Sequence, residues 1–168
     1  MAFQIVLLDA KKHKRDRFDC GVESLNRYLT KYANQDLKRK AATVFVLIDS
    51  PANNVIAYYT LSAFTLEVSE LEPKIAKKLP RYPLLPAAML GRLAVDKNYR
   101  GQKSGKLMLV DALKRAYLAT QQVASTAVIV DAINDNAVSF YEKYGFMSFK
   151  SNPNRLYLIM STIAKMFV

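Results

Sequence analysis

The chain has little of what builds disulfides, zinc sites and histidine-dependent catalysis. Its 168 residues include one cysteine, Cys20, and one histidine, His13. A single cysteine excludes an internal disulfide framework and fits a reducing compartment. One histidine and one cysteine cannot supply the four nitrogen and sulfur ligands of a zinc site within one chain. They also argue against a Ser-His-Asp or Cys-His enzyme, because the base would have to be His13 in a charged N-terminal stretch.

Long apolar runs are scarce as well. The apolar run at 3–8 is too short to span a bilayer, and it precedes the first basic residues, the reverse of a secretory signal. The next apolar stretch, 84–90, contains a proline, and no internal repeat or low-complexity linker divides the chain. A chain of 168 residues has the size of one domain. We therefore expect a single cytoplasmic domain over residues 1–168, without membrane contact.

Basic residues are in excess and unevenly spread. Lys and Arg number 25 against 14 Asp and Glu, which leaves a net charge of +11. Residues 74–115 hold eleven basic and two acidic residues, whereas residues 41–73 hold four acidic residues and no basic one. The resulting +9 window attracts polyanions through long-range, salt-sensitive fields, so we expect a negatively charged partner there. For the N-terminal basic cluster, a solubility bias is the simpler explanation.

Apolar spacing predicts alternating strands and helices. Strands are expected at 3–8, 43–48, 55–66, 89–95, 126–132, 146–150 and 156–163. Helices are expected at 22–37, 71–79 and 107–122, and after a cap at Asn134 or Asp135 as far as Gly145. The turn composition of 49–54 predicts an antiparallel pair around it, and the element order predicts a mixed sheet with strand–helix–strand units in its second half.

The segment 93–107 contains the first candidate site: a strand, a glycine-containing turn and a helix start. Successive backbone N–H groups at such a turn point into one concavity, and the helix N-terminus adds positive potential, so a pyrophosphate is the natural ligand. Gly101 and Gly105 allow close approach of the backbone. Positive charge is available from Arg100, Lys103 and Lys106. An ordinary turn before a helix is the alternative interpretation.

Two familiar phosphate motifs do not fit this turn. A Walker A loop has four residues between its glycines and a Ser or Thr after the lysine, whereas here three residues intervene and Leu107 follows Lys106. The dinucleotide pattern G-x-G-x-x-G fails because its second glycine would fall at Lys103.

A second motif follows the strand at 126–132. The pattern N-x-x-A-x-x-F-Y-x-x-x-G-F is matched by Asn134, Ala137, Phe140, Tyr141, Gly145 and Phe146. Together with the turn, it resembles the GNAT family of acetyl-CoA-dependent N-acetyltransferases, whose turn reads Gln/Arg-x-x-Gly-x-Gly/Ala. Arg100 and Gly105 fit that turn, while Lys103 stands where the first glycine belongs. A left-handed conformation at Lys103 would be strained.

The resemblance implies an α/β (α+β) fold, a mixed and mostly antiparallel sheet of six to seven strands flanked by about four helices. It implies acetyl-CoA as co-substrate, in a cleft where the strands at 89–95 and 126–132 splay apart, and no metal. The implied cofactor contacts are Leu93 and Val95 for pantetheine, Arg100, Gly101, Gln102, Lys103, Ser104, Gly105 and Lys106 for the pyrophosphate, and Asn134 and Ala137 beside the cofactor. The family's usual general acid corresponds to Tyr141, which would protonate the departing CoA thiolate.

The chemistry of acyl transfer is consistent with that role. A phenol, with an ordinary pKa of about 10, stays protonated at neutral pH and lies close enough to a thiol, at about 8.5, to donate as the thiolate forms. The alternative is that Tyr141 packs in the core, as expected for Phe140 and Tyr144.

The N-terminal part indicates the acceptor. Residues 18–29 and 33–36, with the strand at 90–96, look like the GNAT-type toxins of bacterial toxin–antitoxin modules. Those enzymes acetylate the α-amino group of aminoacyl-tRNA, arrest translation and are held inactive by an antitoxin with a ribbon-helix-helix DNA-binding domain. The resemblance implies the same substrate and partner for this chain. The basic window argues independently for RNA, with Lys74, Lys77, Lys78, Arg81 and Arg92 as the expected contacts.

Two alternatives to this function stay open. The first is a GNAT enzyme that acts on a small-molecule or protein amine. The second is a non-catalytic RNA- or partner-binding module in which Lys103 impairs cofactor binding. The apolar C-terminal stretch 163–168 is either an inner strand or a covered surface. A homodimer is a further possibility.

Overall fold

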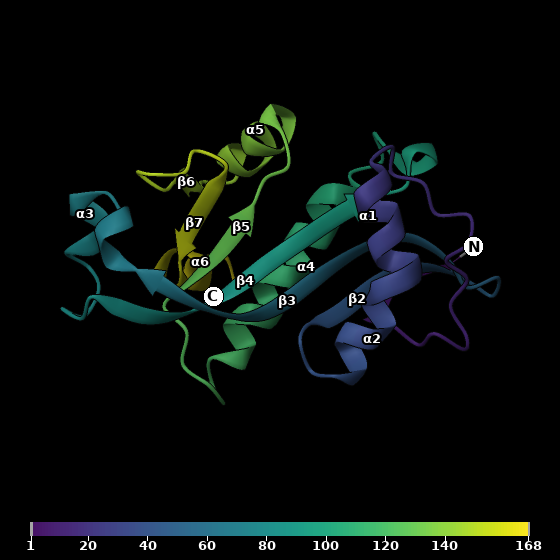
Figure 1. The fold of residues 1–168 in the computed structure, drawn as a ribbon, viewed down its shortest axis with the longest axis horizontal. Helices are drawn as coiled ribbons and strands as arrows, with labels where there is room; N and C mark the ends of the chain where they lie inside the picture. Colours follow the sequence, from purple (N-terminus) through teal and green to yellow (C-terminus); the bar gives the residue numbers. More distant parts are fainter. Residues whose placement is uncertain (1, 168) are drawn as a thin grey trace. The chain divides into compact units, whose positions relative to one another are not determined.

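The computed structural model describes residues 2–167 and divides the chain into two compact units. Unit 1 runs up to Ser62 and resumes over Arg92–Ala112, and unit 2 comprises Ala63–Gly91 and the chain from Leu113 onward. Strands β3 (Asn54–Glu67) and β4 (Leu84–Val95) and helix α4 (Ser104–Ala119), labelled in Figure 1, each continue from one unit into the other. The expectation of a single domain stays a prediction.

In unit 1 the strand order is β1-β2-β3-β4, with β1 at Ala2–Leu7 and β2 at Thr43–Ser50. Strand β2 pairs antiparallel with β1 and with β3. The turn between β2 and β3 includes Asn53 in the left-handed conformation (φ 62°), which asparagine tolerates better than most residues. The predicted antiparallel pair is therefore confirmed.

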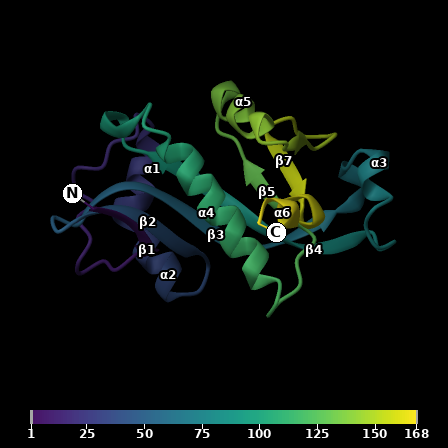
Figure 2. The same ribbon diagram turned by 180° about the vertical axis from the view of Figure 1, so that it is seen from behind.

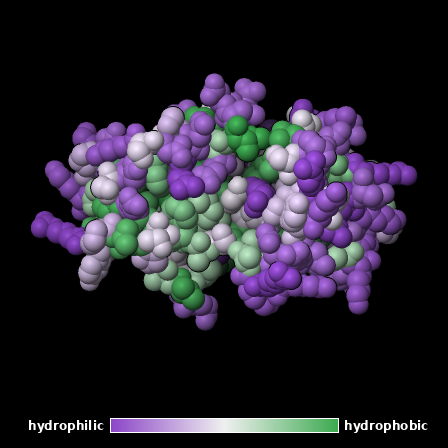
Figure 3. Space-filling model, in the orientation of Figure 1, coloured by the Kyte–Doolittle hydropathy of each residue, from purple (hydrophilic) through white to green (hydrophobic). Residues whose placement is uncertain are grey.

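One helical run covers a face of these strands. It consists of α1 (Glu23–Arg27), a π-helical segment η1 (Tyr28–Tyr32) and α2 (Ala33–Lys38), and its bounds lie within one residue of the predicted helix at 22–37. Its buried side chains join one core with strand residues. Figure 1 shows α1 and α2 on one side of β2 and β3, and Figure 2 shows α4 on the other. The outward face of α1 and α2 is predominantly hydrophilic (Figure 3), as the amphipathic pattern requires.

In unit 2 the strand order is β3-β4-β5-β7-β6. Strand β5 (Ala127–Asp131) pairs parallel with β4 from Ala88↔Val128 to Leu90↔Val130 and antiparallel with β7 (Arg155–Ile159), which also pairs with β6 (Met147–Ser148). Helix α4 is the crossover that parallel neighbours require. The mixed sheet with strand–helix–strand connectivity is confirmed.

The core of unit 2 forms between the strands and the segment that follows β3. That segment contains a 3₁₀ turn, η2 (Val68–Glu70), and helix α3 (Pro73–Ala76), the only part of the helix expected at 71–79 that is α-helical. Leu71 is 1% exposed and packs in one cluster with residues of β3, β5 and β7. Helix α5 (Asp135–Lys143) follows β5.

The bounds predicted for the strands at 89–95 and 156–163 are wrong. Strand β4 begins at Leu84, because the carbonyl of the exposed Pro86 accepts hydrogen bonds from Thr126 N and Oγ1, both at 2.8 Å, and neither bond needs the N–H that proline lacks. The strand expected at 156–163 ends at Ile159, where helix α6 (Met160–Met166) begins. Residues 163–166 are therefore helical and not an inner strand, while residue 168 lies outside the described residues. None of the helices in residues 2–167 has the length and apolar character to cross a membrane.

Candidate functional site

The turn after β4 has the backbone conformation of a phosphate-binding loop. A 3₁₀ turn, η3 (Lys97–Tyr99), leads to two residues with left-handed backbones, Gly101 (φ 80°) and Lys103 (φ 61°), before α4 begins at Ser104. A side chain at Gly101 would meet no atom within 4 Å, so φ rather than space favours glycine there. The first amides of α4 lack intrahelical acceptors and are donors for an anion. The strand–turn–helix arrangement predicted for 93–107 is confirmed, and the anion stays a prediction.

The left-handed conformation of Lys103 is costly for a residue with a Cβ, by about 1–2 kcal/mol. We expect Lys103→Gly to unfold with a free energy about 1 kcal/mol higher than Lys103→Ala, since both variants lose the ammonium and only glycine relieves the backbone. Urea unfolding of the two variants measures this difference. Calorimetric titration with acetyl-CoA should give the glycine variant an affinity at least equal to that of the alanine variant. Weaker binding by the glycine variant would contradict a cradle built from main-chain amides.

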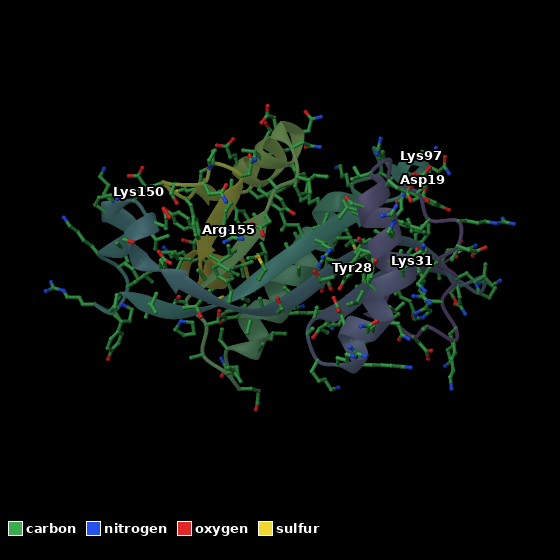
Figure 4. The ribbon with its side chains drawn as sticks, viewed as in Figure 1. Asp19, Tyr28, Lys31, Lys97, Lys150 and Arg155 are labelled. Carbon is green, nitrogen blue, oxygen red and sulfur yellow. The ribbon has the colours of Figure 1, made fainter. Side chains whose placement is uncertain are left out.

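The same turn holds the N-terminal loop of unit 1. Lys97 Nζ lies 3.0 Å from Asp19 Oδ2, its backbone N–H donates to Asp19 O at 2.8 Å, and Asp19 N–H donates to Asp96 Oδ2 at 3.1 Å. Figure 4 shows Asp19 and Lys97 together. Arg100 Nη2 donates to the carbonyl oxygen of Cys20. The guanidinium expected on the pyrophosphate is therefore already bonded to a main-chain carbonyl, and its contact with a cofactor stays a prediction.

Asp19 organises this loop through several donors. Its Oδ1 accepts from Gly21 N–H at 2.9 Å and from Asn26 Nδ2 at 3.0 Å. The Gly21 amide, then Lys97 and Asn26, lower the pKa of the Asp19 carboxyl to about 2. The sequence did not reveal this network, because its members are up to 78 positions apart and no local pattern links them.

A carboxyl with a depressed pKa stabilises the fold at pH values above its unfolded pKa of about 3.9, and this contribution is lost as the pH falls through about 2. We therefore expect Asp19→Asn to be less stable than the parent protein at pH 7, with a difference that shrinks between pH 4 and pH 2. Urea unfolding across this range measures it. Asp16→Asn, an exposed neighbour, is the matched control and should show little difference at any pH. If the difference in unfolding free energy between Asp19→Asn and the parent protein stays constant with pH, the carboxylate is excluded as its cause.

Tyr141 is a buried residue of α5 in unit 2. Asn134 caps the helix by accepting a hydrogen bond from Ala137 N–H at 2.9 Å, and Gly145 (φ 96°) follows the helix end, both as predicted. The Tyr141 ring is 4% exposed, and its centroid lies 5.5 Å from that of Phe146. Burial, and then the negative charge of Asp131, raise the pKa of Tyr141 above its ordinary value. The phenol is therefore protonated at neutral pH, which is the state a general acid needs.

The residues expected to touch acetyl-CoA come from both units. Leu93 and Val95, half-buried in β4, and the turn at 100–106 belong to unit 1. Asn134, Ala137 and Tyr141 belong to unit 2. Beyond the last register pair, Leu90↔Val130, β4 continues for five residues to Val95 while β5 ends at Asp131. Gln102, Lys103 and Lys106 are exposed, and Ser104 and Gly105 are half-buried.

The basic residues expected to contact RNA have two different environments. Lys74, Lys77, Lys78 and Arg81 are all exposed in and after α3 of unit 2. Arg92 belongs to unit 1, is half-buried, and has its guanidinium carbon 3.6 Å from the ring centroid of Tyr28. Across residues 2–167, no three His, Cys, Asp or Glu side chains are grouped so as to hold a metal ion.

Related proteins align with most of this chain in sequence. Residues 85–160 match the acetyltransferase (GNAT) domain family. The chain is 27% identical over 163 residues to a probable toxin, TacT, of Sinorhizobium fredii, covering 93% of this chain and 90% of that protein. It is 28% identical over 143 residues to the tRNA-acetylating toxin of Mycobacterium tuberculosis, covering 85% of this chain and 84% of that one.

Solved structures of similar chains have the same fold as this chain. A tyrosine-to-phenylalanine mutant of KacT has a TM-score of 0.92 at 28% identity, covering 99% of this chain and 100% of that one. AtaT complexed with acetyl-methionyl-tRNAfMet has a TM-score of 0.91 at 30% identity, with the same coverage. A tyrosine-to-phenylalanine mutant of AtaT bound to acetyl-CoA and the C-terminus of the antitoxin AtaR has a TM-score of 0.85 at 26% identity, covering 99% and 98%. The expected fold is confirmed, and the chain belongs to the GNAT family of acetyltransferases.

Proposed function

We propose that this protein is a toxin that uses acetyl-CoA to acetylate the α-amino group of aminoacyl-tRNA and thereby blocks translation. The observation that carries this proposal is the likeness of the whole chain to AtaT, a structure of which contains acetyl-methionyl-tRNAfMet. The relative from Mycobacterium tuberculosis is itself named a tRNA-acetylating toxin. Structures of AtaT with acetyl-CoA support the same co-substrate here.

In the proposed reaction, the neutral α-amino group attacks the thioester carbonyl carbon. A C–N bond forms, the C–S bond breaks, and the thiolate takes a proton from the Tyr141 hydroxyl. The nitrogen loses one proton as the amide forms, and a proton from solvent returns the Tyr141 phenolate to the phenol, so the protons balance. The amides of the turn at 101–106 would hold the diphosphate, and the main chain of Leu93 and Val95 would align the pantetheine arm. The amine of an aminoacyl ester should be less basic than a chain terminus, whose pKa is about 7.7–8.0, so a substantial neutral fraction exists at pH 7 without a dedicated base.

The partners follow from the substrate and the relatives. The four exposed basic residues at 74–81 supply positive charge for a polyanionic acceptor stem. AtaT has been solved with the antitoxin AtaR, which supports an antitoxin for this chain too. We propose that the antitoxin carries a ribbon-helix-helix DNA-binding domain and holds the enzyme inactive. The substrate makes the cytoplasm the expected compartment, and a homodimer stays a prediction.

The test is direct transfer of label. Purified protein is incubated with radiolabelled acetyl-CoA and a pool of charged tRNA, and the aminoacyl ester is then hydrolysed. We expect the label to be recovered as N-acetyl-amino acid, and uncharged tRNA to remain unlabelled. Label that appears only on added polyamine or protein would favour the small-amine or protein-amine enzyme. Calorimetry without any heat from acetyl-CoA would favour the non-catalytic module.

A further inference from the structure

Arg92 lies in an environment that sets it apart from the other basic residues of unit 1. Its guanidinium carbon is 3.6 Å from the ring centroid of Tyr28, close enough for a cation–π contact. Its backbone N–H donates to Thr60 Oγ1 at 3.1 Å. Because Arg92 is half-buried, its charge is less screened by water than that of an exposed lysine. Both the backbone and the side chain of Arg92 are thus fixed in place.

The ring under Arg92 is itself held from several sides. Tyr28 is 4% exposed, stacks on Tyr58 with centroids 6.1 Å apart and an interplanar angle of 17°, and donates from its hydroxyl to Asp36 Oδ2 at 2.7 Å. Tyr58 donates in turn to the carbonyl oxygen of Leu25 at 2.7 Å. Tyr28 is also the first residue of the π-helical segment η1, and such segments recur at functional sites. Figure 4 labels Tyr28 on the helical run.

Within residues 2–167, no carboxylate forms an ion pair with the Arg92 guanidinium. The guanidinium rests on the Tyr28 ring, and its N–H groups lie in the guanidinium plane. Arg92 is half-buried, so part of its side chain is exposed to solvent. A rigid fork of donors, fixed and partly desolvated, matches the paired oxygens of a phosphate. The arrangement is therefore built for an anion that the chain itself does not supply.

We propose that Arg92 binds the phosphate of the acceptor strand's terminal nucleotide, the one that carries the amino acid. This inference rests on the proposed function. Arg92 adjoins Leu93 in β4, whose main chain is proposed to hold pantetheine, and only a nucleoside separates the reacting amine from that phosphate. Tyr28 acts as a positioning residue through its contact with the guanidinium. A phosphate of CoA is the other source of the same chemistry.

The experiment uses the full chain and three acceptors of increasing size. The first is a 3′-aminoacyl-adenosine analogue without a 5′ phosphate, the second is the aminoacyl-CpA dinucleotide, which adds the terminal phosphodiester, and the third is aminoacyl-tRNA. Steady-state kinetics with each acceptor, and with varied acetyl-CoA, are compared for the parent protein, Arg92→Met and Arg92→Lys. The methionine variant keeps an apolar stem on Tyr28, and the lysine variant keeps a charge without the fork.

We expect Arg92→Met to raise KM about ten-fold or more for the dinucleotide and for tRNA, the loss typical of a hydrogen bond to a charged group. The KM for the phosphate-free acceptor, the KM for acetyl-CoA and kcat should each change less than about three-fold. Arg92→Lys should show a smaller rise confined to the same two acceptors. A rise confined to acetyl-CoA would assign the site to CoA. An equal loss on all acceptors, or no change in any KM, would also overturn the proposal.

Lys31→Met is the matched control, since it removes one positive charge from the helical segment that contains Tyr28, the residue on which Arg92 rests. Lys31 is exposed and lines a separate groove of about 410 Å³ with residues 16–19. We expect its KM values to stay within two-fold of those of the parent protein. If Arg92→Met does not fold, as judged by circular dichroism, the comparison of Arg92→Lys across the three acceptors decides the question. If the parent protein acetylates none of them, the proposed function itself fails, and the two failures are therefore distinguishable.

Discussion

Replacing Tyr141 by Phe is expected to lower kcat by about 10² to 10⁴-fold while leaving the Kd for acetyl-CoA within about two-fold. The hydroxyl is the group proposed to protonate the thiolate, so its removal affects the step that breaks the C–S bond. The ring remains, and its contacts with Phe140 and Phe146 should keep the fold intact. Single-turnover acetylation of aminoacyl-tRNA and calorimetric titration with acetyl-CoA measure the two quantities separately.

The neighbouring Tyr144 provides the control. Its ring centroid lies 5.3 Å from that of Phe140, and it is half-buried just after the end of α5. We expect Tyr144→Phe to keep kcat within about three-fold, because only a packing role is assigned to it. Equal losses in both variants would indicate a general effect on α5, and unchanged turnover in Tyr141→Phe would reduce Tyr141 to a core residue.

The pH dependence offers a second measurement on the same residue. Burial and the charge of Asp131 raise the pKa of Tyr141 above its ordinary value of about 10. The acid form of the phenol therefore persists at least as far as that pH. We expect kcat in the parent protein to rise as the amine loses its proton and then to stay level to about pH 9.5. A fall well below this pH would show that another group, with a lower pKa, supplies the proton.

The sequence predicts well those parts of the fold that depend on interactions between residues close together in the chain. The α5 motif works because Asn134 caps the helix three residues before an N–H that needs an acceptor, and Gly145 supplies a positive φ at the other end. The left-handed backbone at Lys103, which would be strained in any residue with a Cβ, is present as well. This strain also has a local cause, because it arises from clashes between the Cβ and the adjacent backbone. Capping and turn chemistry are readable before tertiary contacts are known.

Where prediction failed, tertiary structure decided the outcome. Thr162 and Ile163 are β-branched and favour a strand, yet Ile163 is fully buried as part of α6. The π-helical geometry of η1 leaves no signature in apolar spacing, which still fits an ordinary helix. The contacts of Asp19 with Lys97 and of Arg92 with Tyr28 join positions far apart in the chain. Such contacts depend on the packing of the sheet and helices, which no local motif encodes.

Neutralising the basic cluster in and after α3 should weaken binding of tRNA and reduce its dependence on salt. The change replaces Lys74, Lys77, Lys78 and Arg81 by Gln. Each phosphate contact to a single strand or duplex contributes about 0.7 to 0.9 to the slope of log K against log salt, so four contacts contribute about 3. Between 50 and 200 mM salt, the Kd of the parent protein should therefore rise about 60-fold more than that of the variant. Filter binding of charged tRNA across this range measures both slopes.

The control removes four charges from elsewhere, by changing Lys11, Lys12, Lys14 and Arg17 to Gln, all of them exposed residues of the N-terminal loop. Both variants have the same net charge, so a non-specific field would lower both slopes equally. If the residues at α3 form a defined RNA-binding surface, only the α3 variant should show a smaller slope of log K against log salt. Turnover of the aminoacyl-CpA dinucleotide should be unaffected in both, because that acceptor is too short to reach beyond its own terminal phosphate. Loss of dinucleotide turnover in the α3 variant would place these residues at the chemical step instead, and equal slopes for the two variants would leave net charge alone as the cause of tRNA attraction.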